Sequence, residues 1–251
     1  MLFVLDGATF LAYIGVLVFV HDNAPAEHHA DAPASYAVVL RDRVFVGLWT
    51  LNFLFVTAGY SLFNLVPPFA RDHAHVSEHE IGAFFFVNTI VIVIVQLPIS
   101  RAIEGRRRMR ALALMPTAWI VAWLLVDVAG WRLDAAGAFV VIAVALAIFG
   151  VGECFHGPAH QALVAEIAPP HLRGRYFAVH SLSWGLAGTV GPALGGFVLA
   201  AAPFALWPLA AGVCAVAAAG SLAFERRIPP ELRRVPHTEV EPPVLALAGT
   251  G

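Results

Sequence analysis

The sequence contains no lysine and few charged residues of any kind. All 15 basic residues among its 251 are arginine, and charged residues make up 13% of the chain, about half of what a water-soluble domain usually carries. The absence of lysine excludes a Walker A phosphate loop, a Schiff base to pyridoxal phosphate or retinal, and a lysine nucleophile. A net charge of −2 provides no basic face for nucleic acid. The mean hydropathy of +0.77 disfavours both a soluble enzyme and a disordered chain.

Cysteine is equally scarce. The only two, Cys154 and Cys214, each lie in an apolar run. The sequence therefore predicts neither a disulfide framework nor a Cys-x-x-Cys metal site, and no cofactor is expected.

Long apolar runs dominate the rest of the sequence. A helix needs roughly 20 apolar residues to cross the ~30 Å core of a bilayer. Seven stretches qualify: 1–20, 44–66, 80–100, 110–129, 136–164, 176–200 and 203–224. Each is longer than a barrel strand and lacks strict alternation, so helices are favoured. The predicted fold class is an all-α integral membrane protein with seven transmembrane helices.

The runs divide the chain into four parts. Residues 1–20 are predicted to be a retained transmembrane helix, because they lack the positive start and the small-residue cleavage site of a signal peptide. Residues 21–43 form a polar linker, and 44–224 form a six-helix transmembrane bundle. Residues 225–251 contain five prolines and mixed charge, which predicts a disordered tail.

The arginines predict the orientation. When the connections are assigned alternately to the two sides of the membrane, thirteen arginines fall on one side and only Arg71 and Arg132 on the other. Arginine accumulates in cytoplasmic loops, so the linker and the C-terminus are expected in the cytoplasm and the N-terminus outside. The run Arg106–Arg108 is expected to serve this topology and to contact anionic lipid.

The fifth span carries ionisable groups at membrane depth, where they are costly and indicate function. Glu153, His156 and His160 stand at i, i+3 and i+7, which predicts one shared helix face. Glu153 and His156 are candidates for proton coupling, since a carboxyl group can exchange a proton with a neighbouring imidazole. A structural hydrogen bond to another helix and a divalent metal site are the alternatives.

Other polar residues lie within the spans. They either line an aqueous cavity or join helices through hydrogen bonds. In the sixth span His180, Ser181 and Trp184 are expected to share a face. The candidates for a substrate path are Asn52, Tyr60, Asn64, Asn88, Gln96, His180 and Trp184.

Two regions of the sequence carry recognisable motifs. One comprises Gly152-Glu153, Gly157-Pro158, Leu163-Val164-Ala165, Ala168 to Tyr176, Ser183-Trp184-Gly185 and Gly191 to Gly196. It resembles helices ten and eleven of members of the major facilitator superfamily, especially bacterial drug-efflux carriers. Within it Gly191, Pro192, Gly195 and Gly196 resemble the family's antiporter motif, which implies gating or close packing. The other, Gln96 to Arg108, resembles the loop between helices eight and nine, which implies gating roles for Arg101 and Arg106. Ser100 stands where that loop often has Asp.

The resemblance extends over nearly the whole chain but covers only part of the family's architecture. Family members have twelve helices in two halves, with substrate bound between the halves. This chain resembles helix six, the central loop and helices seven to twelve. A fragment of a longer protein is favoured over a half-carrier that dimerises and over a degenerate remnant.

The implied function is secondary transport of small molecules, with proton-coupled efflux of drug-like compounds across a bacterial inner membrane. The implied partners are the bilayer, a small-molecule substrate, the proton and, for a half-carrier, a second half-transporter chain. An enzyme is not expected: a rhomboid-like protease would need a Gly-x-Ser-Gly motif, which is absent, and adjacent His180 and Ser181 diverge by about 100° around a helix. A seven-helix receptor is the other alternative, although without lysine it cannot bind retinal.

Overall fold

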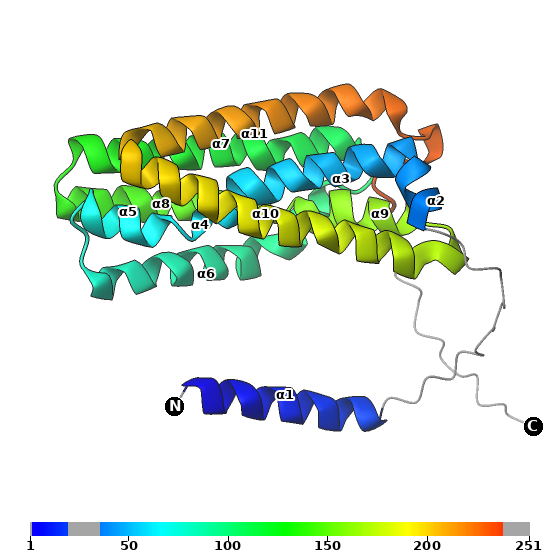
Figure 1. The fold of residues 1–251 in the computed structure, drawn as a ribbon, viewed down its shortest axis with the longest axis horizontal. Helices are drawn as coiled ribbons and strands as arrows, with labels where there is room; N and C mark the ends of the chain where they lie inside the picture. Colours follow the sequence, from blue (N-terminus) through cyan, green and yellow to red (C-terminus); the bar gives the residue numbers. More distant parts are fainter. Residues whose placement is uncertain (1, 20–35, 238–251) are drawn as a thin grey trace, which may run out of the picture. The chain divides into compact units, whose positions relative to one another are not determined.

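The computed structural model describes residues 2–19 and 36–237, which belong to two compact units. The first unit, residues 1–33, contains helix α1 (Leu2–Phe19), which coincides with the first predicted span. The second unit contains every other element (Figure 1). Most of the predicted linker 21–43 lies outside the described residues, and its last part forms helix α2 (Tyr36–Arg41).

The second unit is a bundle of long helices that run side by side (Figure 1). Its elements are α2, α3 (Arg43–Phe55), η1 (Val56–Tyr60), α4 (Ser61–Phe63), α5 (Val66–Asp72), α6 (Glu78–Ala102), α7 (Arg108–Arg132), α8 (Ala135–Glu153), η2 (Gly157–Gln161), α9 (Ala162–Ile167), η3 (Pro170–Leu172), α10 (Arg173–Ala201), α11 (Pro203–Phe224), η4 (Glu225–Arg227) and η5 (Pro230–Leu232).

Six helical stretches of the described residues are long and apolar enough to cross a membrane. They are Arg43–Phe63, Glu78–Ala102, Arg108–Arg132, Ala135–Ile167, Pro170–Ala201 and Pro203–Arg227. They coincide with the last six predicted spans, so the predicted all-α membrane fold is confirmed. Helix α1 is not among the six, and the seventh crossing stays a prediction.

Polar side chains mark where several helices begin. Asp42 accepts hydrogen bonds from the backbone N–H groups of Val44 and Phe45, and Asp134 accepts one from Gly137. Ser77 and Glu80 form a reciprocal capping box at the start of α6. These contacts satisfy backbone donors that have no partner within their own helix. They explain why the apolar spans are separated at these positions.

Helix α7 packs against α8 and α11 and carries two fully buried tryptophans. The Trp119 ring stacks on Phe149 of α8 with 4.7 Å between centroids, and its Nε1 donates to the Phe149 carbonyl at 3.1 Å. Trp123 Nε1 donates to the carbonyl of Ala58 in η1 at 2.8 Å. Each indole thus buries a large apolar surface and also satisfies its N–H group.

The close approach of η1 to α7 depends on Gly59. A methyl group on Gly59 would overlap the ring of Trp119. Because Trp119 is fully buried and held by Phe149, it has little room to move aside. Gly59 therefore allows the π-helical turn of η1 to pack against the tryptophan layer.

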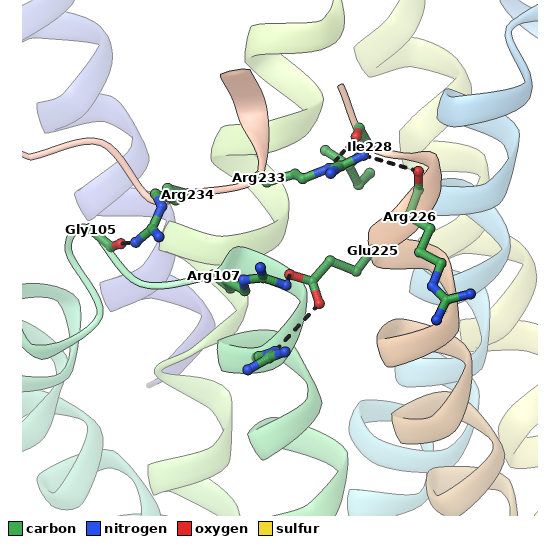
Figure 2. Close-up of polar contacts among 8 residues, drawn as sticks. Gly105, Arg107, Glu225, Arg226, Ile228, Arg233 and Arg234 are labelled. Carbon is green, nitrogen blue, oxygen red and sulfur yellow. Dashed lines mark hydrogen bonds and ion pairs between the residues drawn. The ribbon is translucent and has the colours of Figure 1, made fainter. Parts of the chain in front are cut away.

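One end of the bundle, which we call the arginine-rich end, is closed by contacts between the α6–α7 connection and residues 225–237. The backbone N–H of Gly105 donates to the Val235 carbonyl at 2.9 Å, and the N–H of Val235 donates to the Arg106 carbonyl at 3.0 Å. Figure 2 shows Arg234 reaching the carbonyl of Gly105. The predicted disordered tail 225–251 therefore begins too early: residues 225–237 pair with a loop, and 238–251 lie outside the described residues.

An ion pair with one buried partner strengthens the same end. The Arg108 side chain is 1% exposed, and its Nη2 lies 2.6 Å from Oε1 of Glu166 at the end of α9. Arg108 Nε also donates to the carbonyl of Arg234 at 2.9 Å. One guanidinium thus connects the start of α7 with the end of α9 and with the C-terminal segment.

We expect Gly59→Ala to lower the free energy of unfolding by about 1–3 kcal/mol, the usual cost of overpacking a dense core. Gly82→Ala is the matched control, because Gly82 lies in α6 with open space around its Cα. Thermal unfolding in detergent, followed by tryptophan fluorescence, measures both variants. Equal melting temperatures for the two variants would contradict the packing role of Gly59.

Candidate substrate path and proton-coupling site

The fifth predicted span is broken in its middle, next to its ionisable residues. Helix α8 ends at Glu153, a turn follows at Cys154 and Phe155, and the π-helical turn η2 begins at Gly157. Pro158 has no backbone N–H to donate to the carbonyl four residues earlier, which belongs to Cys154. Gln96 Nε2 on α6 donates to that carbonyl at 3.2 Å. A side chain from another helix therefore replaces the missing backbone donor.

Because of this break, Glu153, His156 and His160 do not share the predicted helix face. Glu153 Oε2 accepts a hydrogen bond from Asn88 Nδ2 of α6 at 3.0 Å. His156 Nε2 instead lies 2.8 Å from Asn52 Oδ1 of α3, and His160 Nε2 lies 3.1 Å from the carbonyl of Leu48. The turn at Cys154 and Phe155 interrupts the regular helical period between Glu153 and the two histidines. The carboxyl group and the imidazoles consequently point to different neighbouring helices.

The imidazoles form a cluster of three inside the bundle. The ring centroids of His156 and His160 lie 5.1 Å apart, and those of His160 and His180 lie 5.4 Å apart. All three side chains are buried. Among the described residues, His160 Nδ1 and both ring nitrogens of His180 have no hydrogen-bond partner. No group of three or more His, Cys, Asp or Glu residues in this part of the chain could hold a metal ion.

Asn52 joins this cluster to α10. Its Nδ2 donates to Ser183 Oγ at 2.7 Å, and Ser183 Oγ donates to the carbonyl of His180 at 2.6 Å. The sequence indicated Ser181 as the inward serine, but Ser181 is exposed and Ser183 is fully buried. The reason is the helical period, which places Ser183 beside His180 on the buried stripe that continues to Ala187. Ser183 was missed because a serine three residues from a histidine carries no signal of its own.

Three predicted path residues line one hollow between η1–α4 and α10. Tyr60, Asn64 and Trp184 border it together with Val56, Ser61, Gly188 and Pro192, and its volume is about 180 Å³. The rings of Tyr60 and Trp184 lie 5.0 Å apart, and the ring of His156 lies 5.7 Å from Trp184. The hollow thus has aromatic walls and lies next to the histidine cluster.

Asn88 and Gln96, the two α6 candidates, lie away from this hollow. Asn88 contacts Glu153 and also donates to the Leu146 carbonyl at 3.3 Å, and Gln96 contacts Cys154. Both side chains therefore join α6 to the α8 segment through hydrogen bonds.

The glycines of the predicted packing motif divide into two groups. A methyl group on Gly191 would overlap Ser61, and one on Gly195 would overlap Leu62. Ser61 Oγ also donates to the Ala187 carbonyl at 3.0 Å, so α10 lies very close to η1 and α4 here. Gly196 has open space around its Cα, and Pro192 lines the hollow. Arg101 and Arg106 are exposed near the arginine-rich end.

This arrangement defines a class of protein: a helical membrane protein with polar and aromatic side chains buried between its spans. The model of the Major Facilitator Superfamily matches residues 48–249. The chain belongs to that superfamily.

Two curated relatives agree with the family assignment. One is the uncharacterized MFS-type transporter YhjO of Bacillus subtilis (strain 168), 28% identical over 110 residues, which is 44% of this chain and 27% of that protein. The other is the uncharacterized MFS-type transporter YdeE of Escherichia coli (strain K12), 39% identical over 57 residues, 23% of this chain and 14% of that protein. The matches thus span less than a third of either relative. No solved structure matches the chain.

We expect Gln96→Leu to cost about 1–3 kcal/mol of stability, because it leaves the buried Cys154 carbonyl without a donor. In a Pro158→Ala background the backbone N–H at position 158 can serve that carbonyl, so the same substitution should cost less. Ser100→Ala is the control, since it removes only the weaker contact that Gln96 makes with Ser100 at 3.4 Å. Thermal unfolding of the wild type, Gln96→Leu, Pro158→Ala and the double variant measures the coupling between the two substitutions. Equal costs in both backgrounds would contradict the compensation.

Proposed function

We propose that the chain functions in secondary transport of small molecules across a bacterial inner membrane, as proton-coupled efflux of drug-like compounds. Family membership is the observation that carries the proposal. The aromatic hollow next to buried histidines supports it, because an amphipathic compound needs an apolar wall and a few polar groups. The chain spans only part of its relatives, so a preceding half, in the same polypeptide or in a second chain, is the proposed partner.

Glu153 is the proposed proton-coupling residue. It is half-buried within a membrane-spanning stretch, where an ionised carboxylate is costly unless it is hydrogen-bonded or protonated. The amide of Asn88 provides one hydrogen bond to the ionised form. Uptake of a proton would remove the charge and weaken this tie between α6 and the end of α8. Loading with a proton can thereby change the packing of two helices.

His156 is the residue that we propose responds to the substrate, because it lies between the hollow and the buried polar contacts of the bundle. Its ring lies beside Trp184 at the wall of the hollow, and its Nε2 contacts Asn52. Glu153 and His156 use different partners in this conformation, so a proton that passes between them requires a change of conformation. Substrate binding against Tyr60 and Trp184 would act on the same histidine.

We expect Glu153→Gln to abolish proton-driven transport while leaving substrate binding intact, because glutamine keeps the side-chain shape but cannot exchange a proton. Proteoliposomes that contain the full chain and a fluorescent lipophilic cation, under an imposed pH gradient, measure transport. Glu231→Gln is the matched control, since Glu231 is exposed. Unchanged proton-dependent flux in Glu153→Gln would remove this residue from the mechanism. Flux by the wild type no greater than in protein-free vesicles would contradict transport by this chain alone.

We also propose that the arginine-rich end faces the cytoplasm. Arg106→Cys and Leu133→Cys place thiols near the two ends of α7, and both native cysteines are buried. A membrane-impermeant maleimide should label Leu133→Cys in intact cells, and Arg106→Cys only after permeabilisation, because arginine accumulates on the cytoplasmic side. The reverse pattern would overturn the orientation.

A further inference from the structure

The arginine-rich end contains a hollow whose lining residues carry more positive than negative charge. The hollow lies where the start of α7 meets the end of α11 and has a volume of about 520 Å³. We call it the basic hollow. It is lined by Arg107, Arg110, Leu222, Glu225, Arg226 and Arg233. Four guanidinium groups therefore surround a single carboxylate.

The contacts of these side chains leave positive charge available. Glu225 is shared by Arg107 at 3.1 Å and Arg110 at 3.5 Å. Arg233 donates to the backbone carbonyls of Ile228 and Arg226 (Figure 2), which carry no net charge. The Arg226 guanidinium has no hydrogen bond or ion pair within residues 36–237. An anion in the basic hollow would meet an excess of three positive charges.

The C-terminal segment is what brings Arg233 to this position. The N–H of Arg108 donates to the Arg233 carbonyl at 2.8 Å, next to the backbone bridge between Arg107 and Arg234. The hollow is thus built by segments more than a hundred residues apart in sequence and held by backbone pairing. It is not a chance cluster of flexible surface side chains.

A second, mainly apolar hollow adjoins the first. We call it the apolar hollow. It has a volume of about 630 Å³ and shares Arg107 and Arg110 with the basic hollow. Its remaining lining residues are Ala102, Ile103, Arg106, Ala111, Leu114 and Phe155. Charge and apolar surface therefore lie side by side, on the two hollows that share Arg107 and Arg110.

The order of charge and apolar surface follows the axis of the bundle. Leu114 lies one helical turn further into α7 than Arg110. Leu222, near the end of α11, precedes Arg226 of the turn η4. Each of these leucines is 51% exposed. A ligand that places an anionic group among the arginines would thus lay an apolar chain along the leucines, toward the bilayer core.

We propose that the basic and apolar hollows together bind an anionic phospholipid, with its phosphate among Arg107, Arg110 and Arg226 and an acyl chain against Leu114 and Leu222. Guanidinium groups match phosphate oxygens in geometry and charge. A soluble phosphate ester would use the arginines but gain nothing from the leucines. This proposal depends on the location of the chain in a membrane, which its family membership indicates, and does not depend on any transport activity.

The test compares binding of a fluorescent phosphatidylglycerol and a fluorescent phosphatidylcholine to the purified full chain in neutral detergent. The wild type should prefer phosphatidylglycerol. Each arginine near an anionic headgroup contributes about fivefold in affinity, so Arg110→Gln with Arg226→Gln should weaken phosphatidylglycerol binding about 25-fold. Arg132→Gln with Arg173→Gln is the matched control, because these arginines are exposed and line neither hollow. This control should leave the affinity unchanged.

Further variants and a competing ligand determine which kind of ligand binds. Arg226→Gln alone should weaken binding about fivefold, and it removes no hydrogen bond or ion pair that the side chain makes within residues 36–237 (Figure 2). Leu222→Asn should weaken phosphatidylglycerol but not glycerol phosphate. If the two double variants weaken phosphatidylglycerol binding equally, the lipid is attracted by the general surface charge and the proposed site is wrong. Displacement of the lipid by glycerol phosphate at equal concentration would overturn the lipid in favour of a soluble phosphate.

Discussion

Buried polar groups in this bundle must find their partners inside the protein, because the hydrocarbon core of a bilayer provides no water to replace them. Most of the long-range bonds that meet this requirement run from a side chain on one helix to a backbone carbonyl on another. Trp49 reaches Val179, Ser61 reaches Ala187, and Trp123 reaches Ala58. The bundle is therefore joined at specific heights, and its packing depends on which backbone carbonyls these side chains reach.

Irregular turns provide two of the carbonyls that accept such bonds. The π-helical turn η1 presents the Ala58 carbonyl to Trp123, and the break around Pro158 presents the Cys154 carbonyl to Gln96. The same two irregularities place Tyr60 and the histidines at one level of the bundle, where their rings meet. Local departures from the α-helix thus serve both packing between helices and the candidate site, as π-helical turns often do at functional positions.

Charged groups at the arginine-rich end do not all need partners inside the protein, because this end lies where lipid headgroups and water begin. Here the buried Arg108 is paired with Glu166, while the more exposed arginines of the basic hollow outnumber the one carboxylate among its lining residues. Arginines in such a cluster remain hydrated at the membrane boundary, and they also still attract anions. Closure of the end by the C-terminal segment and binding of an anionic ligand are therefore compatible in one small region.

Much of the fold could be predicted from the sequence, while the site could be predicted only as a set of residues. Hydropathy located the six long spans, because each span must be apolar over nearly its whole length. The pairings within the site were not predictable. Asn52 and Ser183 are 131 positions apart, and nothing in the local sequence of either residue indicates the other. The single face expected for Glu153 and His156 was wrong because a regular helical period was assumed across Cys154 and Phe155, where the helix is interrupted by a turn.

What the sequence by itself determined is which residues lie within the membrane spans, since the cost of polar groups in lipid acts on each residue separately. Only the tertiary structure decided which helices these residues join, that Ser183 and not Ser181 faces inward, and that residues 225–237 are ordered against a distant loop. The physical reason is the nature of the acceptors. A backbone carbonyl is the same chemical group in every residue, so its selection as a partner depends on how the helices approach one another and not on the identity of the side chain beside it.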